Sequence, residues 1–430
     1  MADTVTYAIN GGLPIFSELR VLDLTDERGA ISGRMFAEFG ADVIKVEPPG
    51  GCSSRRVGPF LDGVPGPERS LYHASYGAGK RSVTLNLDCL DGQLLFRDLV
   101  RQADFVIESR GEKYFDERGI GYDQMAEDNP QVIYCSITPF GDRGPGAAWT
   151  AVDINTWAAG GMMYITGLPG KPPLQITMPQ AGLHAGAEAA TSSMLAYLAR
   201  VGDGHGQKVV VDTQACVVWT LLNEQALPLL HGGEFLSRTG VMAGSAAVAR
   251  KTVFECADGH VTFSLTGGTH TASSRLMVEW MAEENMAPDF LMDIDWSTWT
   301  LAVFAAGPDA EFMRTVHAAD AALERFLATK TKAELYDRAT KRRMLLAPVA
   351  TVKDIAEDKQ LAARQYFRTV HHESVNRDLE LPGSFVQFSA LPAGSVSAAP
   401  SLGEHNVAVY GDLLGISLER LRYMYSAGII

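Results

Sequence analysis

The chain has 430 residues, of which 46% are hydrophobic and 20% are charged, a composition typical of a folded globular protein and not of a disordered one. Its length exceeds what a single hydrophobic core usually spans, so we expect a large domain and a smaller one. The 51 acidic residues outnumber the 37 basic residues and give a net charge of −14. This bulk charge argues against nucleic acid and anionic membranes as partners, and an anionic ligand would need a local pocket of basic side chains or backbone amides.

The five cysteines are scattered and form no CxxC pair; they are Cys52, Cys89, Cys135, Cys216 and Cys256. An odd, scattered set is typical of reduced thiols in a cytoplasmic protein. Residues 1–14 lack the basic flank and apolar run of a signal peptide. No window approaches the roughly 18 uninterrupted apolar residues of a transmembrane helix. We therefore expect a cytoplasmic protein.

Strands and helices alternate in the first half of the chain. Residues 20–24 and 41–47 are short apolar runs typical of buried strands, and residues 30–39 between them have helical spacing and end at Gly40. After a loop rich in Gly and Pro at 48–66, the pattern predicts strands at 81–87, 104–108 and 131–138, a helix at 91–103 and a helix or turn at 114–128. This alternation predicts an α/β fold with a mostly parallel sheet between helices; an antiparallel α+β arrangement is the alternative.

The second half is largely helical. Residues 181–200 have apolar side chains on one helical stripe and are followed by a glycine-rich turn and a strand at 207–212. Residues 240–275 look like a loop with strands, and residues 275–345 look helical. Pro and Gly between 382 and 400 indicate an extended segment that crosses a surface before a short helix at 417–426.

Several short segments occur in an order found in one protein family. They are VLDLT (21–25), FGADVIKVEPPG (39–50), KRSVTLNL (80–87), ADFVIE (103–108), residues 129–137, PFG (139–141), GP (144–145), GQ (206–207), VD (211–212), APV (347–349), QLAAR (360–364) and PSLGEH (400–405). In these segments the chain resembles the class III CoA-transferases, the CaiB/BaiF or formyl-CoA transferase-like family, over nearly its whole length. It looks most like the non-nucleophilic subunit of two-subunit members, such as the succinyl-CoA:benzylsuccinate type of anaerobic aromatic degradation. An unrelated α/β enzyme is the alternative.

The resemblance implies a Rossmann-like large domain built from both ends of the chain, with a smaller α/β domain inserted. We expect the large domain at 1–224, the small domain at 225–320, and a return to the large domain with the tail at 321–430. Family members typically form dimers whose two chains interlock like rings.

The family's chemistry implies an aspartate nucleophile that this chain lacks. In the family an aspartate attacks a CoA thioester and carries the acyl group and then CoA, which divides one difficult transfer into easier steps. The family pattern Asp-x-x-x-Gly, placed by Gly186 and by the GQ at 206–207, puts Gly182 at the nucleophile position. His184, Glu188 and Asp153 are the nearby alternatives, and for each of them a structural role is our first interpretation.

Family positions near the nucleotide of CoA carry over by resemblance to eleven residues of this chain: Arg28, Gly29, Leu85, Asn86, Ser109, Arg110, Gly111, Arg118, Thr138, Phe140 and Gly141. The chain departs from the family at three places where basic residues are often found, because it has Pro48, Asp88 and Thr138 there. A carboxylate at Asp88 would repel a phosphate, for which Arg110 would compensate, and Arg55 and Arg56 are further candidate phosphate ligands. The family's glycine-rich closing loop is placed at 240–247.

Three hypotheses follow. The chain is the non-nucleophilic subunit of a heteromeric CoA-transferase whose homologous partner supplies the aspartate; or a homodimeric enzyme with altered chemistry on CoA thioesters, such as a racemase or isomerase; or a non-catalytic CoA-binding scaffold. Under all three we expect a cytoplasmic, metal-free chain; a CoA thioester is the expected substrate, and no permanently bound cofactor is expected. No His/Cys/Asp spacing predicts a metal site and no Walker motif predicts ATP use.

Overall fold

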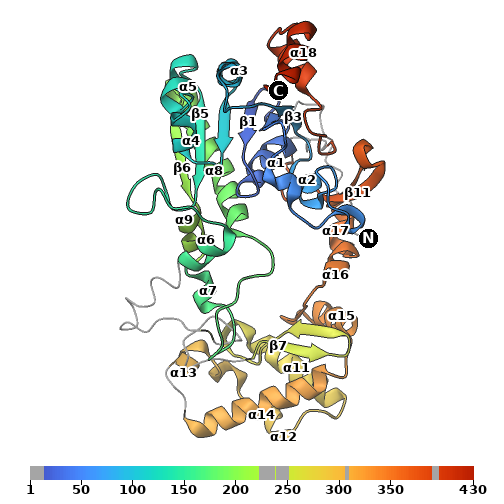
Figure 1. Ribbon diagram of the computed structural model, residues 1–430. Coiled ribbons are helices and arrows are strands. Elements are labelled where there is room, and N and C mark those ends of the chain that lie inside the picture. The colour runs from blue at the N-terminus through green and yellow to red at the C-terminus, as the bar shows by residue number, and fades with distance from the viewer. Residues whose placement is uncertain (1–13, 222–237, 239–250, 306–308, 390–396) are drawn as a thin grey trace. The chain divides into compact units, whose positions relative to one another are not determined.

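The computed structural model describes residues 14–221, 238, 251–305, 309–389 and 397–430. The chain forms two compact units (Figure 1). The first comprises residues 1–160, 176–220 and 359–430, and the second comprises residues 161–175 and 221–358. The glycine-rich loop predicted at 240–247 lies outside the described residues.

A parallel six-stranded sheet organises the first unit, in the order β3-β2-β1-β4-β5-β6. Its strands are β1 (Arg20–Leu24), β2 (Asp42–Glu47), β3 (Arg81–Thr84), β4 (Phe105–Glu108), β5 (Ile133–Thr138) and β6 (Lys208–Asp212). This is the doubly wound order of a Rossmann-like fold, in which the chain starts at the middle of the sheet and winds outward in both directions. The predicted parallel sheet is therefore confirmed, and the antiparallel α+β alternative is wrong.

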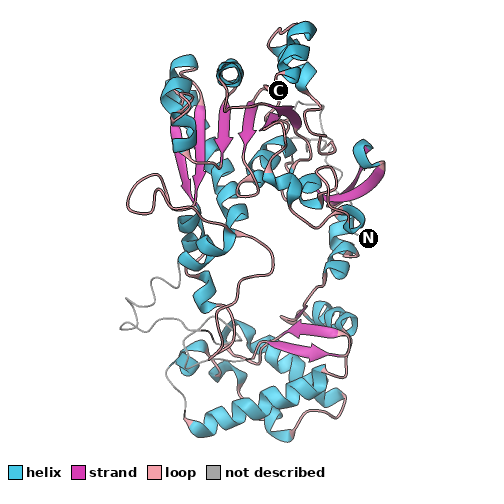
Figure 2. Ribbon diagram, viewed as in Figure 1, coloured by secondary structure: helices cyan, strands magenta, loops and turns pink. Residues whose placement is uncertain are grey.

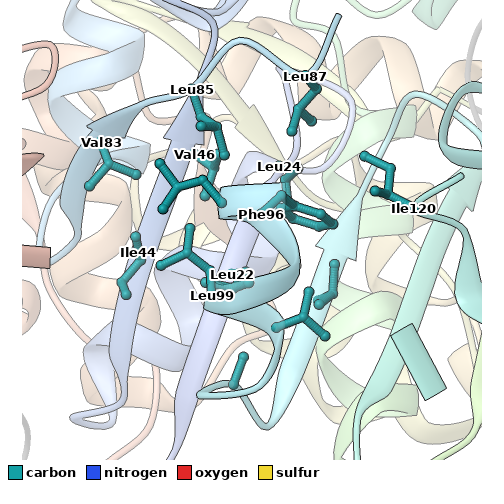
Figure 3. Packing of buried hydrophobic residues seen from close by; sticks show 14 of the residues in the cluster. Leu22, Leu24, Ile44, Val46, Val83, Leu85, Leu87, Phe96, Leu99 and Ile120 are labelled. Atoms are coloured by element: carbon teal, nitrogen blue, oxygen red, sulfur yellow. The ribbon is translucent and has the colours of Figure 1, made fainter. Parts of the chain in front are cut away.

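Helices cover both faces of this sheet (Figure 2). On one face, α1 (Ala30–Glu38) and α8 (Ala181–Asp203) pack on Val21, Val43 and Phe105. On the other face, α3 (Leu90–Val100) places Phe96 and Leu99 over Leu22 and Ile44 (Figure 3). Because the strands are buried on both sides, apolar residues in them do not alternate with exposed polar ones, and the charged Asp23, Lys45 and Glu47 are themselves buried.

The remaining elements of the first unit surround this core. They are α2 (Leu71–Tyr76), α4 (Glu112–Asp116), α5 (Tyr122–Asp128), α6 (Asp153–Ala159), α9 (Thr213–Trp219), α17 (Lys359–Ala363), the antiparallel hairpin β10 (Phe367–His372) and β11 (Arg377–Pro382), the π-helix η7 (Val407–Leu413), α18 (Leu418–Ser426) and the 3-10 helices η1 (Ser53–Arg56), η2 (Leu61–Gly63) and η6 (Glu373–Val375). The hairpin was not predicted. The segment after it returns to the β3 edge, where Thr84 N donates to Asn406 Oδ1 at 2.9 Å.

The second unit has its own core. Its strands β7 (Val253–Cys256), β8 (Gly259–Thr262) and β9 (Ala347–Pro348) form an antiparallel sheet. Its helices are α7 (Met162–Ile165), α11 (Thr271–Glu283), α12 (Asp289–Met292), α13 (Leu301–Ala305), α14 (Ala310–Leu327), α15 (Lys332–Arg342) and α16 (Val352–Ala356), with 3-10 turns η4 (Gly268–His270) and η5 (Trp296–Thr298). Phe254, Trp280 and Phe326 are buried at its centre. In neither unit do the described residues include a helix long and apolar enough to cross a membrane.

Candidate functional site

The candidate site lies at the carboxyl edge of the parallel sheet. The strand order reverses between β1 and β4, so the loops that follow these two strands turn to opposite faces and leave a crevice, the usual place for a ligand in an open α/β sheet. The eleven residues carried over from the family follow the strand ends there. Arg28 and Gly29 follow β1, Leu85 and Asn86 follow β3, and the three groups at 109–111, 118 and 138–141 lie after or at the ends of β4 and β5.

Two loops are tied together across the crevice by Asp26 and Ser109. Asp26 N donates to Ser109 Oγ, and Ser109 Oγ donates to Asp26 Oδ1, both at 2.9 Å. The Asp26 carboxylate also holds the guanidinium of Arg28, with Nη2 at 2.5 Å from Oδ2 and Nε at 2.9 Å from Oδ1. Burial raises the pKa of Asp26, but the hydrogen bonds and charge of Arg28 outweigh burial and lower it. Arg28 is thereby a pre-oriented cation, and its side chain is still 37% exposed.

A second cationic group surrounds Tyr114. The guanidinium carbons of Arg110 and Arg118 lie 4.8 and 3.7 Å from the centroid of the Tyr114 ring. Arg118 Nη2 also contacts Asp88 Oδ1 at 2.6 Å, so the carboxylate that would repel a phosphate is paired. Arg110, Tyr114 and Asp88 border a small recess of about 40 Å³, together with Leu24, Val46, Glu47, Pro48, Leu85, Asn86 and Leu87. This recess offers the aromatic ring of Tyr114 and the guanidinium of Arg110, and the carboxylates of Glu47 and Asp88 also line it.

Glu108, which the sequence interpretation missed, shapes the turn that carries Ser109 and Arg110. Its Oε2 accepts from the backbone N–H of Arg110 at 2.5 Å and of Gly111 at 2.8 Å. Tyr134 Oη donates to its other oxygen at 3.0 Å. Burial raises the pKa of Glu108 even though these hydrogen bonds act in the opposite direction. An acid at the end of the apolar run FVIE was the signal that could have identified it.

Several predicted site residues have other partners. The Leu85 side chain is buried in the core (Figure 3). Asn86 donates its backbone N–H to Ile429 O at 2.7 Å and its side-chain amide to Gly428 O at 3.3 Å. Thr138 Oγ1 accepts from Gly141 N at 2.9 Å, and the Phe140 ring packs edge-to-face on Trp149. These side chains are engaged in contacts within the chain and contribute to the structure of this edge of the sheet.

Of the two further arginines, Arg55 is fully buried and unsuited to a phosphate. Its Nε and Nη2 each contact a Glu47 oxygen at 2.8 Å, and Nη2 donates to Pro400 O at 3.1 Å. The expectation that Arg55 is a candidate phosphate ligand is therefore corrected, because its donors serve an internal ion pair. Arg56 is exposed, with one weak bond to Gly50 O at 3.4 Å.

The loop after β1 rests on a buried triad of charges. Asp23 contacts Lys80 Nζ at 2.7 Å and Lys45 Nζ at 3.1 Å, and all three side chains are at most 4% exposed. Lys45 also donates to Thr25 O, and Lys80 donates to Ala30 O at 2.9 Å. The two lysines therefore hold the carbonyls on either side of the loop that carries Asp26 and Arg28.

At the start of α8, Gly182 occupies the predicted nucleophile position. Asp153, on α6, accepts from Ala181 N at 2.7 Å and from Gly182 N at 3.4 Å, so its carboxylate caps this helix. His184 stacks on Trp157 with ring centroids 5.9 Å apart. Glu188 is exposed. Among the three alternative residues, Asp153 is the acid that lies against the helix start.

Comparison with known proteins identifies the class. The family model for CoA-transferase family III matches residues 16–406, and this chain belongs to that family. Subunit BbsE of succinyl-CoA:(R)-benzylsuccinate CoA-transferase from Thauera aromatica is 32% identical over 91% of this chain and 92% of that protein. Formyl-CoA:oxalate CoA-transferase from Streptomyces avermitilis is 29% identical, with coverage of 96% and 98%. A CaiB/BaiF family protein from Brucella suis has a similar structure, with a TM-score of 0.76, 25% identity and coverage of 94% of this chain and 100% of that chain.

In the parts of the chain that the structure describes, no three His, Cys, Asp or Glu side chains gather as metal ligands do. The five cysteines are free thiols, and four of them are buried.

Proposed function

We propose that this chain is the non-nucleophilic subunit of a heteromeric CoA-transferase. The donor is an acyl-CoA such as succinyl-CoA, and the acceptor is a carboxylic acid such as an aryl-substituted succinate. Membership of family III and the similarity to a protein named as a subunit of a benzylsuccinate CoA-transferase support this proposal. The observation that carries it is Gly182, which has no side chain at the start of α8, where the family resemblance calls for an aspartate.

The reaction then needs a carboxylate from a homologous partner. That carboxylate attacks the thioester carbonyl and expels CoA thiolate, which leaves a mixed anhydride. The thiolate attacks the aspartyl carbon of the anhydride and releases the donor acid, which leaves an aspartyl-CoA thioester. The acceptor carboxylate attacks this thioester, and the returning thiolate attacks the acceptor side of the second anhydride, which restores the free aspartate. Two bonds to sulfur form and two break, so the cycle balances without a further reagent.

In this proposal the crevice of the present chain binds CoA. Arg28 and Arg110 would provide guanidinium groups for phosphates, with Arg118 partly neutralised by Asp88. Coenzyme A enters as substrate and leaves as product, and no permanently bound cofactor is required.

The test is to purify the chain alone and together with a homologous subunit that carries the aspartate. CoA transfer from succinyl-CoA to benzylsuccinate is measured by chromatography of the thioesters. We expect this transfer only when both chains are present. Hydroxylamine trapping during turnover should modify the partner's aspartate and no residue of this chain. Full turnover by this chain alone would disprove the proposal.

One observation favours a second candidate, a homomeric enzyme acting on CoA thioesters through Asp153. The Asp153 carboxylate lies 2.7 Å from Ala181 N, at the helix start where the family nucleophile is expected. Hydroxylamine trapping with an acyl-CoA separates the two candidates, because an adduct on Asp153 in the isolated chain supports only the second.

A further inference from the structure

Two glycines of α8 allow this helix to lie against the start of α1. A Cβ atom on Gly182 would lie 2.9 Å from Arg28 Cα and 3.0 Å from Glu27 O. A Cβ atom on Gly186, one turn later, would lie 2.5 Å from the Ile31 side chain and 3.1 Å from Gly29 O. Gly202, on the same helix, has nothing within 4 Å. At Gly182 the atoms that a Cβ would clash with belong to the backbone, which cannot move away by changing a rotamer as a side chain can.

This backbone belongs to the loop that carries Arg28, and the loop is held on its other sides. Lys45 binds the carbonyl of Thr25, and Lys80 binds the carbonyl of Ala30. Ser109 binds Asp26 from the neighbouring loop, and Asp26 in turn holds the Arg28 guanidinium. A side chain at position 182 would therefore have to displace either the loop or the first turn of α8.

The first turn of α8 is also constrained. Asp153 on α6 accepts from Ala181 N, while the N–H groups of Leu183 and His184 both reach Gln180 O at 3.0 Å. Trp157 on α6 stacks on His184. The helix start thus has partners other than the Arg28 loop, and moving it would break the cap.

We infer that Gly182 is a positioning residue: its missing Cβ lets α8 hold the 25–29 loop in place, and so sets the Arg28 guanidinium at the crevice. It follows that replacing Gly182 by aspartate does not restore a working nucleophile. The statement about aspartate at position 182 rests on the proposed function, in which this position has lost the nucleophile. The main readout is CoA affinity, which does not depend on turnover.

The experiment uses the full chain in complex with its aspartate-bearing homologue. The variants are G182A, G182D, R28A, the double variant R28A/G182A, and G202A as the matched control on the same helix. CoA binding is measured by calorimetry. We expect G182A and R28A each to weaken CoA binding about tenfold, and the double variant to weaken it no more than R28A alone, because both changes act through one guanidinium. G202A should leave the affinity unchanged.

G182D should weaken CoA binding at least as much as G182A. In the isolated chain it should give neither transfer nor a hydroxylamine adduct at position 182. Unchanged CoA affinity in G182A, additive losses in the double variant, or turnover by isolated G182D would each overturn the inference. Turnover by the isolated wild-type chain would instead refute the proposed function and leave the affinity result standing.

If G182A does not fold, hydrogen exchange of the wild-type complex decides the question. Amides at 25–30 and at 180–184 should gain protection together when CoA binds, because the two segments are in direct contact. Protection confined to 25–30 would overturn the inference.

Discussion

Asp26 and Ser109 hold each other by two reciprocal hydrogen bonds, although 83 residues separate them in the chain. The bonds connect the loops after β1 and β4, the two strands between which the sheet order reverses. Because Asp26 also binds the Arg28 guanidinium, one carboxylate both connects the two loops and holds a cation beside the crevice.

Removing this link should weaken CoA binding. S109A deletes both bonds and leaves Asp26 N without its partner, so we expect a loss of about 1–2 kcal/mol in stability and a several-fold rise in the Kd for CoA. Calorimetry and thermal denaturation check both effects. S426A, which removes a local bond on α18, is the control and should match the wild type. An unchanged Kd in S109A would show that the link does not serve the ligand.

Replacing either of the two arginines beside Tyr114 should weaken CoA binding, but to different extents. Arg110 contacts Tyr114, whereas Arg118 is also paired with Asp88. We expect R110A to weaken CoA binding about tenfold and to reduce its salt dependence, and R118A to have a smaller effect.

D88N should strengthen CoA binding, because it removes a negative charge and releases Arg118. Calorimetry at two salt concentrations measures all three variants. K113A, at a side chain 85% exposed, is the control. Weaker binding in D88N would contradict the placement of phosphate near this group.

The Glu47–Arg55 pair should make stability depend on pH. Burial raises the pKa of Glu47, but the hydrogen bonds and charge of Arg55 outweigh burial and lower it from 4.5 to about 2. The folded chain thus favours the charged carboxylate, so this stabilisation is complete above pH 4.5 and is lost as the pH falls toward 2. At about 1.4 kcal/mol per pKa unit, it is on the order of 3 kcal/mol.

The variant E47Q tests this dependence. Its denaturation midpoint should lie well below that of the wild type at about pH 7, and the difference should shrink at about pH 3, where the carboxylate of the unfolded wild-type chain is protonated and folding must release that proton. E117Q, at a position 58% exposed, should follow the wild type at every pH. Parallel curves for E47Q and the wild type would rule out the effect.

Asp153 should matter for stability more than for chemistry. D153A removes the cap of α8 and should cost about 1–2 kcal/mol of stability. D153N keeps an oxygen acceptor for Ala181 N, so it should retain most of this stability. Turnover of the D153N complex with the aspartate-bearing subunit should remain within a few-fold of the wild type. A loss of all turnover in D153N, with its fold intact, would favour the second candidate function.

The sequence predicted the alternation of strands and helices, because each element depends on apolar residues that recur at short, regular spacing. The runs at 20–24, 42–47 and 105–108 are rich in apolar residues because helices bury both faces of those strands, and such runs predicted a parallel sheet. The sequence also predicts that Gly182 stands where the family has an aspartate, and this prediction depends only on the register of the family pattern. The hairpin at 367–382 was missed because its strands carry many polar residues, and only its cross-strand pairing defines it.

The tertiary structure alone decided which polar groups meet. Arg55 looked like a phosphate ligand until its partners, Glu47 and a carbonyl 345 residues away, were placed beside it. Asp153 caps α8, and Gly182 lies against the backbone of Arg28. Both contacts join segments that are far apart in the chain. Sequence spacing cannot specify such contacts, because they depend on how buried faces pack and on which donors and acceptors the packing brings within about 3 Å of each other.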